Sequence, residues 1–181
     1  VPKHLGQAFV AIEDKRFFSH DGVDVLRTVK AAANHIFRFS DRFGGSTITQ
    51  QLIKNVTERD EYSLERKLQE IMWALDLETK MSKTEILQNY LNVINFSNGC
   101  YGVGAAADYY FSKNLSELSL LECASIAAIT NNPSYYDPRR NPQNNRARAE
   151  LILSQMQAQG FISSEEYEAA LVEEIVLNIN S

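Results

Sequence analysis

Apolar residues along this chain recur at the spacing of a helix face. Between Ser63 and about Lys80 they follow the i, i+4, i+7 and i+8 pattern, which predicts an amphipathic helix. From Ser116 onward, residues 118–128 are mostly apolar around the single acidic residue Glu122, which indicates a buried central helix. The apolar positions of the first of these helices are Leu64, Leu68, Ile71, Met72 and Leu75.

Capping residues predict the ends of further helices. Asn145 is suited to cap a helix that runs to Gln159 and stops at Gly160. The Ser-x-x-Glu pattern of a capping box occurs twice more. These boxes are Ser82 with Glu85, before a helix through Leu91, and Ser163 with Glu166, before a helix through Leu171. The apolar face expected for the Asn145 helix contains Leu151, Ile152 and Met156.

Composition favours a single globular domain. The chain has 181 residues, of which 44% are hydrophobic and 23% charged, and this excludes disorder over most of its length. Four prolines and eight glycines are few for an all-β protein built on many tight turns. Residues 130–144 hold three of the prolines and predict an ordered polar loop. We therefore expect a mainly α chain with one domain.

Charge, hydropathy and cysteine content exclude some classes of protein. Eighteen Lys and Arg against 23 Asp and Glu give a net charge of −5, which argues against a protein that coats nucleic acid. No apolar run approaches the roughly 20 residues that span a bilayer. Cys100 and Cys123 match no metal motif, so we expect two free or buried thiols. A single disulfide between them is the alternative.

The first candidate for chemistry is the pair Glu13-Asp14. Apolar residues at 8–12 precede it and could bury a carboxylate. A buried carboxylate can exchange a proton near neutral pH, which suits general acid or base catalysis. The alternative is a solvated helix face that the pair shares with Lys15 and Arg16.

The second candidate is the run Gly-Gly-Ser-Thr-Ile-Thr-Gln-Gln at residues 44–51. Two glycines followed by small hydroxylated residues predict a turn into a helix, whose first N–H groups would suit an anion. Gln50 and Gln51 add groups that can hydrogen-bond sugars or amides. The alternative is an ordinary capped helix start with its polar side chains in solvent.

The third candidate is Arg66-Lys67 with Glu70. On a helix, Arg66 and Glu70 lie one turn apart, and the plain interpretation is a surface ion pair. The sharper interpretation is an acidic group held among cations that bind phosphate. Lys54 and Arg59 add to this cationic stretch of an acidic chain, and a phosphorylated leaving group would explain it.

These motifs, in this order, resemble the peptidoglycan glycosyltransferase domain (glycosyltransferase family 51) of penicillin-binding proteins and monofunctional transglycosylases. Residues 44–51 match the family's second motif without a change, and residues 83–92, 101–113 and 133–148 resemble its later segments. The similarity covers nearly the whole chain. The family's first motif, Glu-Asp-x-x-Phe-x-x-His-x-Gly, is matched by Glu13, Asp14, Phe17, His20 and Gly22. Its third motif, Arg-Lys-x-x-Glu, is matched by Arg66, Lys67 and Glu70.

The resemblance implies a fold and a reaction. The fold is a lysozyme-like helical domain over 1–181, with a large lobe and a smaller membrane-facing jaw lobe inserted at about 24–62. The reaction is polymerisation of lipid II into β-1,4-linked glycan strands, with inversion and release of undecaprenyl diphosphate. The implied partners are lipid II, the growing lipid-linked strand, the membrane surface and a transpeptidase domain or partner. The implied location is the extracytoplasmic face of the bacterial plasma membrane.

The resemblance also implies residue roles. Glu13 would be the general base that takes the proton of the acceptor sugar's 4-hydroxyl, and Glu70 would act near the donor diphosphate. We expect no cofactor and no metal-ligand cluster, although the resemblance leaves open a divalent cation (Mg²⁺ or Mn²⁺) near that diphosphate. The implied substrate-binding residues are Asp14, His20, Ser46, Thr47, Gln50, Gln51, Lys54, Arg59, Arg66, Lys67 and Arg148.

Aromatic residues and departures from the family qualify this assignment. Phe37, Phe39 and Phe43 are expected to contact the bilayer interface, with core packing as the alternative. The family often has a basic residue at the position of Tyr62 and Arg at that of Lys30, which puts donor affinity in question. The family's N-terminal transmembrane helix and transpeptidase domain have no counterpart here, so we expect a catalytic domain separated from its anchor.

Two other functions stay open at this point. A muramidase or lytic transglycosylase on a similar scaffold would cleave glycans with one Glu as general acid. It would not need Lys54, Arg66 and Lys67 around a diphosphate. A non-catalytic cell-wall scaffold would bind lipid II without turning it over.

Overall fold

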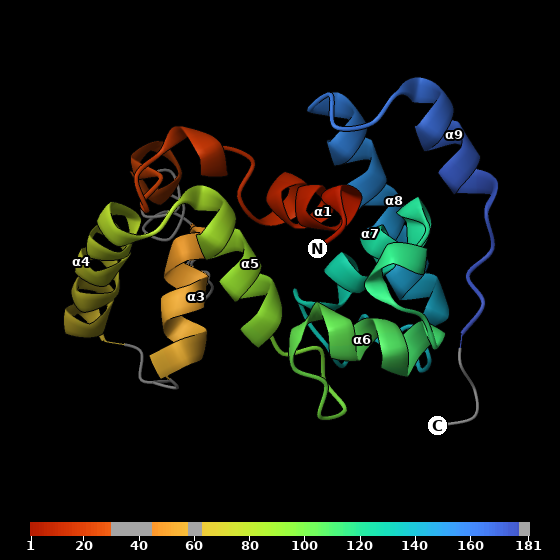
Figure 1. The fold of residues 1–181 in the computed structure, drawn as a ribbon, viewed down its shortest axis with the longest axis horizontal. Coiled ribbons are helices and arrows are strands. Elements are labelled where there is room, and N and C mark those ends of the chain that lie inside the picture. Colours follow the sequence, from red (N-terminus) through yellow and green to blue (C-terminus); the bar gives the residue numbers. More distant parts are fainter. Residues whose placement is uncertain (30–44, 58–62, 178–181) are drawn as a thin grey trace. The chain divides into compact units, whose positions relative to one another are not determined.

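The structure is a computed structural model that describes residues 1–29, 45–57 and 63–177. Over these ranges it consists of helices joined by loops, with no β-strand (Figure 1). The mainly α prediction is therefore confirmed. The chain divides into two compact units, one made of residues 1–15 and 91–181 and the other of residues 16–90.

The first unit is built around one buried helix. Its elements are α1 (Lys3–Glu13), α6 (Gly102–Phe111), η2 (Leu115–Glu117), α7 (Leu120–Ile129), α8 (Pro142–Ala158) and α9 (Ser164–Val172). Helix α7 packs against α1, α6, α8 and α9, and every residue from Leu121 to Ile129 is buried. The predicted central helix is therefore confirmed. Helix α9 begins with the predicted capping box at Ser163.

The start of α7 differs from the prediction. Its N-cap is Ser119 rather than Ser116, which lies in η2. The Ser119 hydroxyl accepts the backbone N–H of Glu122, and the Glu122 carboxylate accepts that of Ser119 at 2.9 Å. Lys113 Nζ lies 2.7 Å from the same buried carboxylate. The capping box and the ion pair together offset the cost of burying Glu122, which explains the choice of start.

The predicted cap of α8 is wrong. The helix begins at Pro142 after Asn141, because a proline in the first turn has the right φ and needs no backbone donor. Asn145 is instead buried inside the helix, where its side-chain NH₂ donates to the carbonyl of Tyr136 at 2.8 Å. The Ser125 hydroxyl donates to its Oδ1 at 2.6 Å. Asn145 thus fastens α8 to α7 and to the preceding loop.

The packed face and the end of α8 are mostly as predicted. Ile152 and Met156 are buried, whereas Leu151 is exposed. Leu153 takes its place in the core. The helix ends just before Gly160, where the sequence predicted its stop.

The two cysteines are free and buried, as expected from the sequence. Burial, with a smaller contribution from the charge of Glu122, raises the pKa of the Cys123 thiol to about 12. Burial, followed by the charges of Asp108 and Asp137, also raises the pKa of Cys100. Both side chains therefore act as small apolar core residues rather than as nucleophiles.

The second unit holds two packed helices. Its elements are η1 (Phe17–Ser19), α3 (Ile48–Thr57), α4 (Leu64–Lys80) and most of α5 (Lys83–Val93). Helix α3 packs against α4. Ser63 caps α4 by accepting the backbone N–H of Arg66 at 3.1 Å, and Ser82 with Glu85 forms the predicted box before α5. The helices predicted from Ser63 and Ser82 are thus confirmed.

The apolar face predicted for α4 is not its packed face. Leu68 is 55% exposed, Met72 is 68% exposed and Leu75 is exposed as well, whereas Ala74 is fully buried. The backbone carbonyl of this buried residue lies close to Gly22. The apolar spacing therefore predicted the helix correctly but not the side that packs.

A partly buried ion pair joins α3, α4 and α5. Thr49 Oγ1 on α3 donates to Glu78 Oε1 on α4 at 2.6 Å. Lys83 Nζ, in the first turn of α5, lies 2.7 Å from the same oxygen and 4.5 Å from the ring centroid of Phe17. Because the Glu78 carboxylate is shared by a hydroxyl and an ammonium, its burial is compensated. The network links α3, α4 and the first turn of α5 within the second unit.

We expect Gly22→Ala to destabilise the protein by about 2 kcal/mol or more. Gly22 has φ +89°, and a Cβ there would lie 2.7 Å from the carbonyl oxygen of Ala74. Urea unfolding measures the loss. The matched control is Gly99→Ala, which has φ +77° with nothing within 4 Å of the added carbon. If the two variants were equally stable, the clash with α4 would be refuted.

Candidate active site

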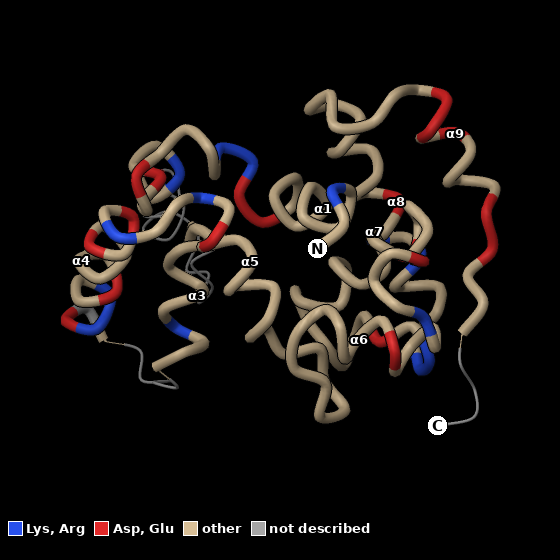
Figure 2. Tube along the Cα trace, in the orientation of Figure 1, with Lys and Arg blue, Asp and Glu red and all other residues tan. Residues whose placement is uncertain are grey.

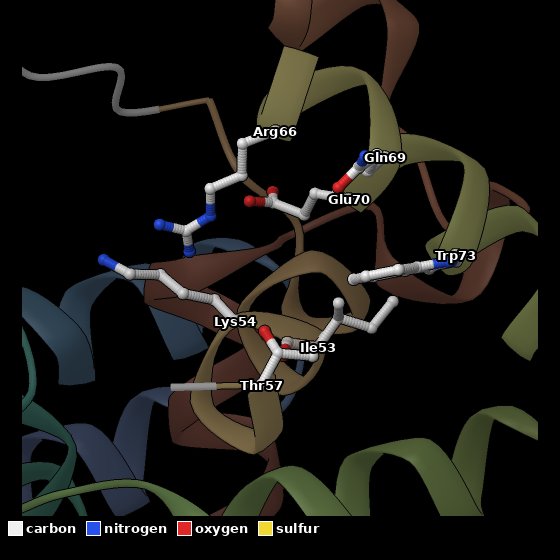
Figure 3. Close-up of a pocket in the computed structure, with 7 residues that line it drawn as sticks. All are labelled: Ile53, Lys54, Thr57, Arg66, Gln69, Glu70 and Trp73. Carbon is white, nitrogen blue, oxygen red and sulfur yellow. The ribbon is translucent and has the colours of Figure 1, made fainter. Parts of the chain in front are cut away.

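Side chains from α3 and α4 line a pocket in the second unit. Its lining residues are Ile53, Lys54, Thr57, Arg66, Gln69, Glu70 and Trp73. Ile53 and Lys54 lie about one turn before Thr57 on α3, and Arg66, Gln69, Glu70 and Trp73 span two turns of α4, so each helix offers one face. Figure 3 shows Lys54 and Arg66 extending to the same side, with the Glu70 carboxylate directed toward them. Trp73 and Ile53 form the apolar side.

Glu70 sits among cations at this pocket. Its side chain is largely buried, and Lys67 one turn earlier forms an ion pair with its Oε1. Lys67 Nζ also donates to Ser46 Oγ at 3.0 Å. Lys67 thus links the hydroxylated turn before α3 to the acidic group on α4. Charge-assisted bonds of this kind hold a carboxylate in one place.

The positive charge of this region is local. Helix α4 carries both signs of charge along its length (Figure 2). Its cations near the pocket are Arg66 and Lys67 in the first turn, and α3 adds Lys54. A guanidinium and an ammonium on one side of a partly buried pocket suit an anion with several oxygens, such as a diphosphate.

Residues 45–51 shape the start of α3. The Thr47 hydroxyl accepts the backbone N–H of Gln50 at 3.2 Å, and Gln50 Oε1 accepts that of Thr47 at 2.9 Å, which is a capping box. The Thr47 hydroxyl also donates to the carbonyl of Gly22 at 2.6 Å. Thr47 and Gln50 are 0% and 1% exposed. The capped-helix alternative thus describes these two residues, but their side chains are buried rather than solvated.

Gln51 faces a different neighbour. Its Oε1 accepts a hydrogen bond from the Tyr90 hydroxyl at 3.2 Å. His20, in the same unit, is partly exposed, and its ring lies edge-on to Phe17 with the centroids 6.3 Å apart. Both contacts hold motif side chains against buried aromatic residues of the second unit.

Glu13 is the last residue of α1 in the first unit. It is partly buried, and Thr130 Oγ1 donates to its Oε1 at 3.3 Å. Asp14 is fully buried, and its backbone N–H donates to the carbonyl of Val10 at 3.1 Å. The solvated-face alternative therefore does not describe this pair. One oxygen of the Glu13 carboxylate is thus held within the first unit by Thr130.

Arg148 projects from α8 in the first unit. Its guanidinium lies over the ring of Tyr136, 5.3 Å from the centroid. Its Nε is buried and has no hydrogen-bond partner among the residues described. The Tyr136 loop is anchored by Asp137, whose carboxylate accepts a hydrogen bond from the Asn98 side chain at 2.9 Å. Arg148 is thus held by stacking rather than by an ion pair in the described structure.

The structure brings some predicted site residues together. Ser46, Lys54, Arg66, Lys67 and Glu70 gather between α3 and α4. Glu13, Asp14 and Arg148 belong to the other unit. Arg59, the aromatic residues Phe37, Phe39 and Phe43, and the positions Lys30 and Tyr62 lie outside the described residues.

Sequence reasoning missed Thr57, Gln69 and Trp73 in the pocket and Thr130 beside Glu13. A signal was present for the first three. Thr57 lies three residues after Lys54, and Gln69 and Trp73 lie three and seven residues after Arg66. Each therefore shares a helix face with a predicted cation. Thr130 had no such signal.

The pocket does not fit a resident metal ion. Glu70 is the single carboxylate in its lining, and the described part of the chain contains no group of three His, Cys, Asp or Glu residues that could hold one. Lys54 and Arg66 would also repel a cation. In the same described ranges, no helix has the length and apolar character needed to cross a membrane.

A family model, curated relatives and a solved structure all relate this chain to transglycosylase domains of penicillin-binding proteins. The sequence model of the family described as Transglycosylase matches residues 1–157. Penicillin-binding protein 1A of Clostridium perfringens is 44% identical over 96% of this chain, and penicillin-binding protein 4 of Bacillus subtilis is 41% identical over 99%. The chain spans only 27% and 29% of the lengths of these relatives.

A solved structure is also similar. The crystal structure of penicillin-binding protein 1A from Haemophilus influenzae matches 71% of this chain with a TM-score of 0.52 and 34% sequence identity. The match covers 16% of that longer chain. The similarity therefore concerns one helical domain of a larger protein.

Proposed function

The chain belongs to the transglycosylase family, and from this premise we propose that it polymerises lipid II into glycan strands of peptidoglycan. The observation that carries the proposal is the pocket in which Lys54 and Arg66 lie beside the largely buried Glu70. A diphosphate leaving group needs stabilisation of its negative charge more than it needs protonation. A pocket with two cations meets that need.

The proposed reaction inverts the configuration at the anomeric carbon of the donor sugar. Glu13 takes the proton from the acceptor sugar's 4-hydroxyl, and the oxygen attacks the donor's anomeric carbon from the face opposite the diphosphate. The bond from that carbon to the diphosphate oxygen breaks, and a β-1,4 bond forms. Undecaprenyl diphosphate leaves as an anion that Lys54 and Arg66 stabilise.

Other residues hold this machinery in place. Lys67 compensates the charge of Glu70 and ties it to Ser46, which supports a donor site in this pocket. The buried Thr47 and Gln50 support the same site by fixing the start of α3, on which Lys54 sits. We therefore assign Thr47 and Gln50 a positioning role in donor binding.

The setting follows from the chemistry of the donor. Its leaving group is a lipid, so we propose that the domain works at the extracytoplasmic face of the plasma membrane. The growing strand stays lipid-linked during synthesis. A transpeptidase domain in the same or a partner protein would then cross-link the product.

The test is an assay with lipid II in detergent and with intact sacculi in parallel. We expect polymer from lipid II and no soluble muropeptides from sacculi. Release of muropeptides without polymer would establish the lytic alternative. Tight binding of lipid II without turnover would establish the scaffold alternative.

A further inference from the structure

We propose that Thr130 is a positioning residue for the carboxylate of Glu13. This inference rests on the proposed function, in which Glu13 is the general base. Thr130 lies 117 positions away in the sequence, yet its Oγ1 is 3.3 Å from Glu13 Oε1. The two residues belong to the same unit, so this contact is internal to it.

The Thr130 hydroxyl has two acceptors and one proton. It donates to the carbonyl of Ala127 at 2.9 Å as well as to Glu13. A hydroxyl carries a single O–H donor, so these two bonds share it. The longer distance makes the bond to Glu13 the weaker of the two, because O–H···O bonds are usually 2.7–2.8 Å long.

This sharing suits a group that must change its charge. While Glu13 is ionised, the hydroxyl restrains one carboxylate oxygen. This restraint limits the directions in which the second oxygen can point. Once Glu13 has taken a proton, the hydroxyl keeps Ala127 as an acceptor and is not left as a buried donor without a partner. Thr130 therefore orients the base and still has a hydrogen-bond acceptor after the proton transfer.

Thr130 also has a rigid support. It follows directly on α7, whose residues from Leu121 to Ile129 are all buried. A β-branched side chain at the end of a packed helix has few rotamers. A donor on such an element can define the position of a catalytic group more closely than one on an exposed loop.

A purely structural role is the competing interpretation. The bond to Ala127 resembles the one that Thr79 makes at the end of α4, where its hydroxyl donates to the carbonyl of Asp76 at 2.7 Å. Both bonds run three residues back along the chain. Thr79 is exposed and lies outside the pocket lining, so Thr79→Val is a matched control for loss of such a bond.

The experiment compares Thr130→Val, Thr130→Ser and Thr79→Val in the lipid II assay. We expect Thr130→Val to lower kcat about fivefold, the change that one hydrogen bond of ordinary net strength supplies, with KM within about twofold. Thr130→Ser should keep kcat within about twofold of the parent, and Thr79→Val should leave it unchanged. A valine variant with parental kcat, or a serine variant as slow as valine, would overturn the inference.

A double-mutant cycle in urea unfolding tests the contact independently of activity. The changes in unfolding free energy caused by Thr130→Val and Glu13→Ala, each of which removes the hydrogen bond, should not add in the combined variant, because the residues interact. Additive changes would overturn the contact. If the parent protein makes no polymer, the proposed function fails and the positioning role fails with it, whereas a slow Thr130→Val variant of an active parent supports both.

Discussion

Glu13→Gln is expected to lower the rate of glycan polymerisation by at least about a hundredfold, because an amide cannot take up the acceptor's proton. The replacement keeps the shape of the side chain and an oxygen that can accept the Thr130 hydroxyl. Folding should therefore be preserved. The measurement is kcat with lipid II, together with the unfolding midpoint.

The matched control for this variant is Glu150→Gln. Glu150 lies on α8 in the same unit, and its carboxylate pairs with Arg146 at 2.6 Å near the surface. This control should retain parental activity. If Glu13→Gln kept more than about a tenth of the parental rate, the assignment of Glu13 as the base would be wrong.

Arg66→Met is expected to lower kcat about a hundredfold, with a smaller rise in KM. The reason is that negative charge on the diphosphate grows as its bond to the sugar breaks, so a cation at this pocket acts most strongly in the transition state. Methionine keeps much of the length and apolar stem of arginine. Single-turnover and steady-state rates with lipid II separate the two parameters.

Lys80→Met is the control for charge removal on the same helix. Lys80 pairs with Asp76 at 2.5 Å at the far end of α4, and both side chains are exposed. Its loss should cost little in stability and nothing in turnover. Equal kcat values for the Lys80 and Arg66 variants would refute a diphosphate site at Arg66.

Helix boundaries could be predicted where the cap is a local signal. The boxes at Ser82 and Ser163 involve residues three positions apart, so the sequence alone contains both partners. The start at Ser119 was missed because Ser116 is also a good cap, and the choice depends on Lys113 meeting Glu122. Asn145 was misassigned because its partners, Ser125 and Tyr136, come from other elements.

Packing faces were harder to predict than helices. The apolar spacing of α4 suggested a buried stripe that includes Leu68 and Met72, but both are exposed. The buried side includes Ala74, whose carbonyl lies close to Gly22, a backbone contact that leaves no hydrophobic pattern in the sequence. Periodicity reports an amphipathic helix but not its neighbour.

The candidate site shows the same division between local and distant signals. Arg66, Lys67 and Glu70 could be grouped in advance, because helical spacing places them on adjacent turns. Joining them with Lys54 required the packing of α3 on α4. Thr130 could not be predicted at all, since its relation to Glu13 exists only after α1 and α7 have packed together.

The position of Trp73 has a practical consequence for studying this protein. It is the single tryptophan of the chain, and it lines the pocket with an indole that is 43% exposed. The molecule therefore carries its own optical label beside Lys54 and Arg66. A ligand that enters the pocket would change the surroundings of one indole rather than an average over several, so its binding can be followed by intrinsic fluorescence without an added dye.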